Sequence, residues 1–387
     1  MKFDIAIIGG GATGSSAAYF LRRHPKAGSV CVIEPDPTYE FASTPKASGG
    51  ARRLFSCPEN IAMSHYSIEF FRAFDRSMAV DGEPAHIEWT PRGYVFIVPP
   101  RGVPAITANY GIQRRHGVNV TLLDPAGLKR RFPSMRVDDL GAGVYSPDDG
   151  WCDPHGVLQG FRRKARALGA EYLTDRVVGI ECSPRRARRI KLETGAAIDA
   201  ATVINATGAW AQNICAMAGM RLPVEPMRRF EHYFDTPNPI EPLPYVKDLD
   251  RLAFRPAGAG YSGGVPQSNE PRGFNFDIDH AYFERVVWPA LAHRFPAFEA
   301  VKCHTTWAGL YDQNELDGNL ILGNWPGRLA NFYVAAGCSG HGLMHAPAMG
   351  RALAELILDG GFQTIDLTRL GYQRVIDNRP YPEQGII

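Results

Sequence analysis

The sequence predicts a mixed α/β protein, in which a discontinuous Rossmann-like domain is combined with a β-rich domain. Strand–glycine–helix segments occur near the start, the middle and the end of the chain, and two inserts between them look mainly β. The chain has 387 residues, and at roughly 150 residues per domain this length corresponds to two or three domains. We therefore expect a Rossmann-like domain of residues 1–88, 144–222 and 311–387, and a β-rich domain of residues 89–143 and 223–310.

The first thirty residues form a complete βαβ pattern. Residues 3–8 are a nearly continuous apolar run, as expected of a parallel strand that is covered on both faces. Glycines interrupt this run at 9–14, residues 15–23 read as a helix that ends in cationic residues, and 29–34 is a second strand. This order predicts two parallel strands joined by a crossover helix.

The glycines of this unit have the spacing of a dinucleotide-binding turn. Gly9 allows the tight turn, Gly11 removes a side chain that would block a pyrophosphate, and Gly14 lets the helix pack close to the strand. The N-terminus of the helix then faces the phosphates. Glu34 follows 20 residues after Gly14, at the end of the second strand, where a carboxylate accepts hydrogen bonds from ribose hydroxyls. The turn predicts dinucleotide binding but does not distinguish NAD from FAD.

The remaining elements follow from periodicity and capping signals. Asp124-Pro125 and Asp153-Pro154 each predict a helix start, because aspartate caps the helix and proline suits its first turn. The basic cluster 185–191 reads as a solvated hairpin. The other expected elements are a loop over 40–58, helices over 60–78, 209 onward, 279–293 and 343–358, and strands over 93–98, 201–205 and 331–336.

Two further glycine turns follow strands. The turn at 205–210 contains Ala206, Thr207, Gly208 and Trp210, which would place small residues beside the same cofactor. The turn at 337–342 opens a helix, and a helix N-terminus stabilises negative charge by about 0.3–1 kcal/mol. A reduced flavin is anionic around N1 and the C2 carbonyl, so this turn favours FAD. His341 and His345 lie in or just after it, either as structural groups or close to the flavin ring.

Composition excludes several classes of protein. The chain has 42 basic and 40 acidic residues, so it lacks the excess of positive charge that is typical of a nucleic-acid-binding protein. Its seven cysteines are scattered without a CxxC pair, which argues against a zinc ribbon and predicts reduced thiols and no metal site. No apolar run approaches the roughly 20 residues of a membrane span, and the start leaves no room for a signal peptide. We therefore expect a soluble, cytoplasmic protein.

With these motifs assembled, the sequence resembles the D-amino-acid oxidase superfamily of FAD-dependent oxidoreductases, which includes monomeric sarcosine oxidase, glycine oxidase and D-arginine dehydrogenase. The resemblance covers nearly the whole chain and rests on the glycine turn with Glu34 and on the segments 47–52, 149–156, 205–210 and 337–342. Segments 48–61 and 361–367 look closest to a subgroup that includes a mitochondrial flavoprotein implicated in assembling respiratory complex I.

The resemblance implies an FAD-binding domain of the glutathione-reductase-related type and a β-rich substrate domain, with the flavin ring at their interface. It implies that the following residues bind FAD: Gly9, Gly11, Ala12, Thr13, Gly14, Glu34, Pro35, Ser48, Gly49, Gly50, Val177, Ala206, Thr207, Gly208, Trp210, Gly337, Ser339, Gly340, His341, Gly342, Leu343 and Met344. The Cys that carries the flavin in sarcosine oxidase aligns near Gly309, so we expect non-covalent FAD.

The substrate side departs from the relatives. Arg52 matches an arginine beside the flavin, whereas the carboxylate-binding Arg and Lys of the relatives fall at Phe55 and at Met344. The position of the Lys that sarcosine oxidase uses to activate oxygen falls near Tyr261. The resemblance therefore favours a dehydrogenase over an oxidase. An amino-acid carboxylate must therefore be held by other groups, and the candidate substrate-binding residues, with Met344, are Arg53, Arg229, His232, Arg255 and His345. The candidate catalytic residues are Arg52, Tyr261, His341 and His345.

These features predict an enzyme that oxidises the C–N bond of an amino acid or secondary amine by hydride transfer to flavin N5. Tyr261 or a histidine would take the ammonium proton. The electron acceptor, which is O2, a quinone or a carrier, stays open. Three alternatives also stay open: a 2-hydroxy-acid or polyol dehydrogenase, which needs a strong base beside the flavin, a flavoprotein assembly factor, and an enzyme that uses a nicotinamide cofactor alone.

Overall fold

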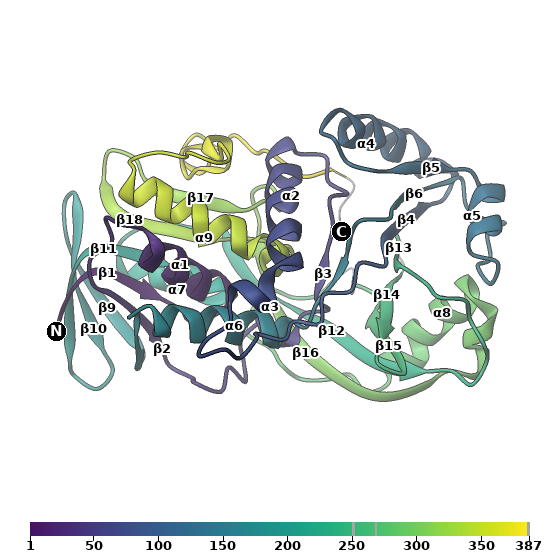
Figure 1. The fold of residues 1–387 in the computed structure, drawn as a ribbon, viewed down its shortest axis with the longest axis horizontal. Coiled ribbons are helices and arrows are strands. Elements are labelled where there is room, and N and C mark those ends of the chain that lie inside the picture. Colours follow the sequence, from purple (N-terminus) through teal and green to yellow (C-terminus); the bar gives the residue numbers. More distant parts are fainter. Residues whose placement is uncertain (250–251, 268, 385–387) are drawn as a thin grey trace.

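The computed structural model describes residues 1–249, 252–267 and 269–384, and it contains two large mixed sheets that lie side by side along the long axis of the molecule (Figure 1). The first sheet has the strand order β17-β18-β11-β1-β2-β8, with β9 and β10 joined to β11. The second has the order β16-β12-β15-β14-β13-β4-β6-β5. The predicted class, a mixed α/β fold with a Rossmann-like part and a β-rich part, is confirmed.

The first sheet contains all the predicted strand–glycine–helix segments. Its central strands pair in parallel, β1 with both β2 and β11, and β11 with β18. Its strands are β1 (Lys2–Ile8), β2 (Val30–Glu34), β8 (Glu171–Thr174), β9 (Val177–Ser183), β10 (Arg186–Leu192), β11 (Ala197–Asn205), β17 (Ile321–Trp325) and β18 (Leu329–Ala336). Its helices are α1 (Ala12–Arg23), α2 (Pro58–Arg72), α3 (Phe74–Ser77), α6 (Pro154–Ala167), α7 (Ala211–Met217), α9 (Gly342–Leu358) and α10 (Gln373–Ile376).

Alternate residues of β1 enter two different cores, which explains its continuous apolar run. Ile5 and Ile7 pack on the face covered by α1, α6 and α9, whereas Ala6 and Ile8 pack on the face covered by α7 and the β9–β10 hairpin. Helices α1 and α9 cross closely, because a Cβ on Gly350 would lie 2.2 Å from the hydroxyl oxygen of Ser16. The basic cluster at 185–191 forms the hairpin strand β10, as predicted.

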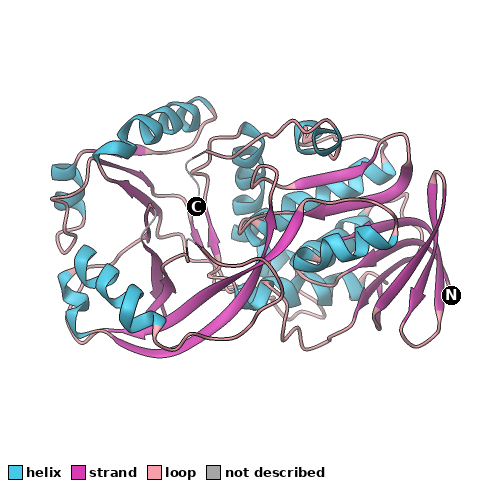
Figure 2. Cartoon of the chain, turned by 180° about the vertical axis from the view of Figure 1, so that it is seen from behind, coloured by secondary structure: helices cyan, strands magenta, loops and turns pink. Residues whose placement is uncertain are grey.

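The second sheet is built from the two inserts. In Figure 2 its strands are drawn in magenta on the side of the molecule away from the N-terminus. Its strands are β4 (Tyr94–Val98), β5 (Thr121–Leu123), β6 (Ala142–Ser146), β12 (Val224–Asp235), β13 (Tyr245–Asp248), β14 (Leu252–Ala257), β15 (Gly260–Gly264) and β16 (Lys302–Asn314). A short pair, β3 (Gly50–Ala51) with β7 (Gly150–Trp151), lies beside it. Strands β6 and β16 cross the predicted domain boundaries at 143/144 and 310/311, so those two limits fall inside strands.

Helix lengths differ from the sequence predictions in three places. The helix expected over 60–78 is two helices, α2 and α3. The insert expected to be mainly β also contains α4 (Val103–Arg115) and α5 (Pro125–Arg131), of which only α5 was indicated by its Asp124 cap. The helix expected over 279–293 is a π-helical turn (Phe283–Val287) followed by α8 (Trp288–Arg294). The predicted Asp153 cap of α6 is confirmed by its hydrogen bonds to two backbone N–H groups.

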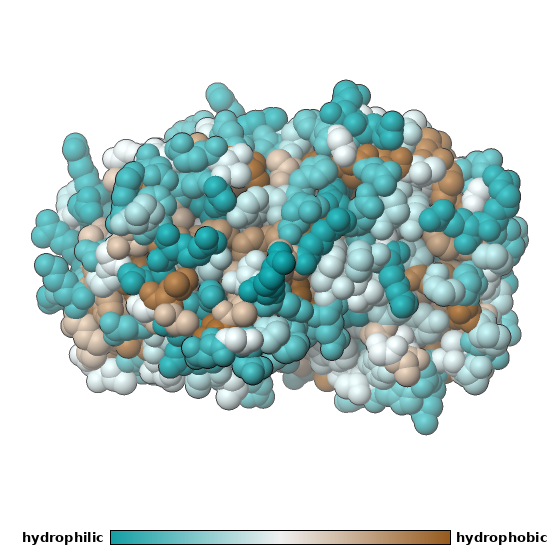
Figure 3. All heavy atoms as spheres, in the orientation of Figure 1, coloured by the Kyte–Doolittle hydropathy of each residue, from teal (hydrophilic) through white to brown (hydrophobic). Residues whose placement is uncertain are grey.

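The surface and the cysteines are consistent with the composition. On the face drawn in Figure 3, hydrophilic residues predominate and apolar residues form small separate groups. Within the described ranges, none of the helices is both long enough and apolar enough to cross a membrane. All seven cysteines have free thiols, and five of them are buried.

Candidate functional site

One cavity of about 920 Å³ is lined by residues from both sheets. It extends from Glu34, at the end of β2, past Gly11 at the start of α1, to His341 at the start of α9. On the opposite side it is lined by β12, β13 and β16 of the second sheet. The three glycine turns that are far apart in sequence therefore open into the same space, because each follows a strand of the first sheet at its carboxyl end.

In the first turn, the space beside Gly11 is open to a ligand, whereas the space beside Gly9 and Gly14 is filled by protein backbone. Gly9 has φ +95°, and a Cβ there would lie 2.6 Å from the carbonyl oxygen of Ala206. A Cβ on Gly14 would lie 1.9 Å from the carbonyl oxygen of Gly9. At Gly11, by contrast, the nearest atom to an added Cβ is the hydroxyl of Thr44 at 3.6 Å. This arrangement is a cradle into which a pyrophosphate fits.

Glu34 is held in place by backbone groups at the edge of this cradle. Its carboxylate accepts hydrogen bonds from the N–H of Gly10 at 2.8 Å and of Asp36 at 3.1 Å. Burial raises the pKa of Glu34, and these N–H groups act in the opposite direction. Each carboxylate oxygen has a second lone pair, so the group fits the hydroxyls of a ribose.

The third turn combines strained backbone with a helix N-terminus. Ser339 has φ +48° and Gly340 has φ +97°. A Cβ on Gly340 would lie 2.7 Å from the ring of Tyr311, so β16 packs directly on this turn. The first N–H groups of α9, including those of Gly342 and Leu343, have no partner within the helix, and both residues line the cavity. This is a site for a group that becomes negatively charged on reduction.

The residues present therefore fit FAD, and 20 of the 22 predicted FAD-binding residues line the cavity. The two exceptions are Gly14 and Gly337. Gly14 acts through backbone packing, as described above. Gly337 has φ +75°, and a Cβ there would lie 3.1 Å from Val224, so this glycine is required by the fit between the turn and β12.

Four of the predicted catalytic and substrate-binding residues also line the cavity: Arg52, Arg229, His341 and Met344. Arg52 is 3% exposed, and its guanidinium lies 4.1 Å from the ring centroid of Phe55. Burial, with the charge of Arg52 next, holds the pKa of His341 well below its usual value, so this histidine is neutral at pH 7. Arg229 donates to the carbonyl of Gln267 and lies over the ring of Tyr311.

Three predicted residues do not line the cavity but contact residues close to it. Arg53 forms an ion pair with buried Asp149 at 3.0 Å, because adjacent residues of an extended segment point in opposite directions. Arg255 donates to the carbonyl of Ser48, a cavity residue, at 2.5 Å. His345 lies 3.1 Å from the hydroxyl of Ser64, and burial with the charge of Arg52 lowers its pKa to about 3.

Tyr261 and His232 lie behind the second sheet, so the structure does not place them where the sequence predicted them. Tyr261 packs against Phe234 and Phe298 in the core under α8. His232 is fully buried on the same side, with its Nδ1 2.9 Å from the hydroxyl of Thr306. A strand presents alternate residues to opposite faces, so an error of one residue in register moves a side chain from the cavity to the core.

The sequence interpretation missed several polar residues that the second sheet contributes to the cavity, among them Tyr94, Glu231, Tyr245 and Lys247. Tyr94 and Tyr245 stack with their ring centroids 4.3 Å apart. Glu231 accepts hydrogen bonds from the hydroxyls of Ser48, at 3.0 Å, and Ser262, at 2.6 Å. The apolar pattern of these strands does not indicate these positions, because both faces of the strands are largely covered.

A metal site is not part of this arrangement. Across residues 1–249, 252–267 and 269–384, no group of three or more His, Cys, Asp or Glu side chains is positioned to hold a metal ion.

Comparison with known proteins agrees with this geometry. Residues 4–356 match the family of FAD dependent oxidoreductases named DAO. "FAD-dependent oxidoreductase domain-containing protein 1" of Xenopus laevis is 36% identical, covering 100% of this chain and 85% of that protein. Mitochondrial sarcosine dehydrogenase of Homo sapiens is 26% identical over 92% of this chain and 40% of its own length.

Among solved structures, L-proline dehydrogenase from P. horikoshii is similar, with a TM-score of 0.87, 27% sequence identity, and coverage of 98% of this chain and 99% of that one. The glycine turns, the single cavity into which they open and a family match over more than nine-tenths of the residues support one assignment. The chain belongs to the DAO family of FAD-dependent oxidoreductases, as its sequence motifs indicated.

Proposed function

We propose that this chain oxidises the C–N bond of an amino acid or a secondary amine and that it works as a dehydrogenase. One observation carries the proposal: the cavity that fits FAD is also lined by Arg52, Glu231 and Tyr245. Such a space suits a small polar substrate bound against the cofactor. The relatives act on substrates of this kind by their names, sarcosine dehydrogenase and L-proline dehydrogenase.

Bound FAD would supply the acceptor for the hydride that leaves the carbon next to the amine. The protein would bind the substrate, orient that C–H bond and remove the proton of an ammonium group. Tyr245 and Tyr94, which stack together, form a rigid aromatic wall against which an amine packs.

Glu231 is our candidate for the proton acceptor, in place of Tyr261. Its carboxylate reaches the cavity, and two hydroxyl groups fix its position. Burial raises the pKa of Glu231, which brings it closer to that of a general base working near neutrality. In this step an oxygen of Glu231 takes the proton of the substrate ammonium, and the neutral amine keeps the lone pair that drives hydride loss.

A dehydrogenase is favoured over an oxidase because of the residues that β15 presents to the cavity side. These are Ser262, which is bonded to Glu231, and Gly264, which lines the cavity. Neither carries a positive charge, so the lysine that the resemblance associates with oxygen activation has no counterpart on this strand. The cofactor would be non-covalent, since Gly309, at the position of the flavin-bearing Cys of sarcosine oxidase, has no side chain.

The test is anaerobic mixing of the purified flavoprotein with a panel of N-methyl, D- and L-amino acids. Loss of the oxidised flavin absorbance by at least one of them is expected, followed by fast reoxidation with an artificial quinone or dye and slow reoxidation with O2. Acid precipitation should release FAD into the supernatant. If no amine in a broad panel bleaches the flavin, the proposed reaction is wrong.

Oxidation of a 2-hydroxy acid is the alternative, and it requires a strong base to take the O–H proton. The histidine that lines the cavity is His341, and burial and the nearby charge of Arg52 hold its pKa well below the usual value. A weak base of this kind argues against the alcohol reaction. Bleaching of the flavin by lactate or glycolate, but by no amine, would favour 2-hydroxy-acid oxidation over amine oxidation.

A further inference from the structure

We propose that the segment 381–384 is a strap that closes the cavity beside Arg52 and limits the size of the substrate that reaches the flavin. Glu383 is the residue that holds this strap in place. The closing of the cavity depends only on FAD binding, whereas the limit on substrate size also rests on the proposed function. Neither the glycine motifs nor the capping signals of the sequence pointed to this segment.

The strap has one side on the cavity and the other in solvent. Glu383 lines the cavity, whereas its neighbours Pro382 and Gln384 are exposed. Tyr381 is turned toward the protein, and its hydroxyl donates a hydrogen bond to Glu59 of α2 at 2.8 Å. Because exposed residues flank a residue that lines the cavity, a single layer of chain separates the cavity from water at this point.

The carboxylate of Glu383 ties the strap to the start of α2. It accepts hydrogen bonds from the backbone N–H and the hydroxyl of Ser56, from the backbone N–H of Cys57 at 3.0 Å and from the side-chain amide of Asn60 at 2.7 Å. These four donors fill the lone-pair positions of a carboxylate. Glu383 is therefore suited to holding the chain in place and not to binding a substrate or taking a proton.

Helix α2 depends on this carboxylate for its N-terminal cap. Its own N-cap residue, Cys57, makes no capping hydrogen bond with its side chain. The first N–H groups of a helix lack partners within the helix, and an acceptor supplied from elsewhere satisfies them. The strap supplies that acceptor through Glu383, so the start of α2 and the strap fix each other.

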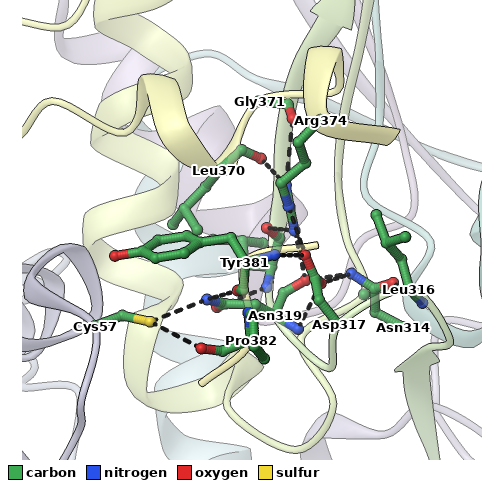
Figure 4. Close-up of polar contacts among 12 residues, drawn as sticks. Cys57, Asn314, Leu316, Asp317, Asn319, Leu370, Gly371, Arg374, Tyr381 and Pro382 are labelled. Carbon is green, nitrogen blue, oxygen red and sulfur yellow. Dashed lines mark hydrogen bonds and ion pairs between the residues drawn. The ribbon is translucent and has the colours of Figure 1, made fainter. Parts of the chain in front are cut away.

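Further hydrogen bonds fix both ends of the strap. The backbone N–H of Tyr381 donates to Asp317 at 2.9 Å, and its carbonyl accepts from Asn319 at 3.2 Å (Figure 4). The carbonyl of Gln384 accepts from the side chain of Asn109 on α4 at 3.0 Å. Helix α2 belongs to the FAD-binding part and α4 to the β-rich part, so the strap bridges the two parts.

The strap lies close to the cation that the proposed function places at the substrate. Burial lowers the pKa of Arg52, and the nearby Tyr94 and Glu383 act in the opposite direction. The guanidinium of Arg52 lies 4.1 Å from the ring centroid of Phe55, and that ring lies 5.3 Å from the ring of His341 at the start of α9. A substituent of the substrate that extends past Arg52 would therefore meet the strap.

The test measures how well bound FAD is shielded from solvent. Acrylamide, an uncharged quencher, is titrated into the FAD-loaded protein while the flavin fluorescence is recorded. The variants are Glu383→Ala, which removes the acceptor, and Ser56→Ala, which removes one of its donors. Gln384→Ala is the matched control, because this exposed residue of the strap makes its hydrogen bonds with Ser56 and Asn109 through its backbone.

We expect Glu383→Ala to raise the Stern–Volmer constant of the flavin by about 10-fold, the usual effect of losing one charged hydrogen bond on an equilibrium between a closed and an open strap. Ser56→Ala should raise this constant by a smaller factor, and Gln384→Ala should leave it unchanged. An unchanged constant in Glu383→Ala with full FAD content overturns the proposal. If Glu383→Ala is recovered without FAD, an unchanged constant in Ser56→Ala overturns it instead.

Hydrogen exchange distinguishes opening of the strap from general loss of stability. The N–H groups of Tyr381 and Gln384, which are bonded to Asp317 and Ser56, should exchange faster in Glu383→Ala than in the wild type. Peptides from the first sheet should exchange at the wild-type rate. Faster exchange in all peptides alike would contradict a strap that opens locally.

A series of amines tests the limit on substrate size. N-methyl-, N-propyl- and N-benzylglycine are compared as reductants of the flavin without oxygen. In the wild type the rate of reduction should fall as the substituent grows, and Glu383→Ala should weaken this dependence on size. Higher quenching in Glu383→Ala, with no amine reducing the flavin in either protein, supports the strap and refutes the proposed reaction. Reduction with the same size preference in both proteins supports the reaction and refutes the limit on substrate size.

Discussion

Asp317 is the centre of a buried polar network that joins the end of the chain to the FAD-binding part (Figure 4). Its carboxylate is fully buried and accepts hydrogen bonds from the guanidinium of Arg374 at 2.8 Å and from the side chain of Asn314 at 2.8 Å. It also accepts from the backbone N–H groups of Tyr381 at 2.9 Å and Asn319 at 3.1 Å. We predict that Asp317→Ala strongly destabilises the protein.

The magnitude follows from what the substitution leaves behind. The side chain of Arg374 is 6% exposed, so loss of Asp317 leaves a buried cation without its counter-ion, which typically costs about 3–5 kcal/mol. Arg374 also donates to the carbonyls of Leu370, Asn319 and Leu320, and these bonds remain. We therefore expect a loss of about 3 kcal/mol in the free energy of unfolding, the lower end of that range.

The assay is urea unfolding of the FAD-loaded protein, followed by tryptophan fluorescence. Asp317→Asn retains one acceptor oxygen and should therefore lower the free energy of unfolding by less than Asp317→Ala does. Asp366→Ala is the matched control, because this exposed aspartate, among the residues that the structure describes, accepts hydrogen bonds only from Thr368. A loss below about 1 kcal/mol in Asp317→Ala, no larger than that of an exposed polar substitution, would refute the reasoning.

Three shorter predictions concern the cofactor and the histidines. Gly14→Ala should abolish FAD binding, since the new Cβ would lie 1.9 Å from the Gly9 carbonyl; purified protein lacking flavin absorbance would agree, and Gly111→Ala on α4 is the control. Gly340→Ala should weaken FAD binding, measured by flavin fluorescence, because the methyl group would meet the Tyr311 ring at 2.7 Å. Folding lowers the pKa of His345 from 6.5 to about 3, so the contribution of this neutral histidine to the free energy of unfolding is fully present above pH 6.5. That contribution declines as the pH falls, by up to about 1.4 kcal/mol per pH unit. His345→Gln should make the free energy of unfolding less dependent on pH in this range. An unchanged pH dependence would contradict the lowered pKa of His345.

The cofactor-binding framework can be predicted from local sequence features. The turn at Gly9, Gly11 and Gly14, the carboxylate of Glu34 and the helix start after Gly340 are local features. In each, a few neighbouring residues set the backbone geometry, and the chemistry follows from that geometry. Because parallel strands end at one edge of the sheet, three such turns converge wherever they lie in the chain. That is why most of the predicted FAD-binding residues line one cavity.

The residues on the substrate side of the cavity depend on how distant strands pair and pack. Glu231 and Lys247 face the cavity, whereas Tyr261 and His232 face the core under α8. Both faces of these strands are largely covered, one by the cofactor cavity and one by packed aromatic rings, so the pattern of apolar residues does not show which face a residue takes. Strand register, set by pairing between segments as distant as 94–98 and 245–248, makes that choice.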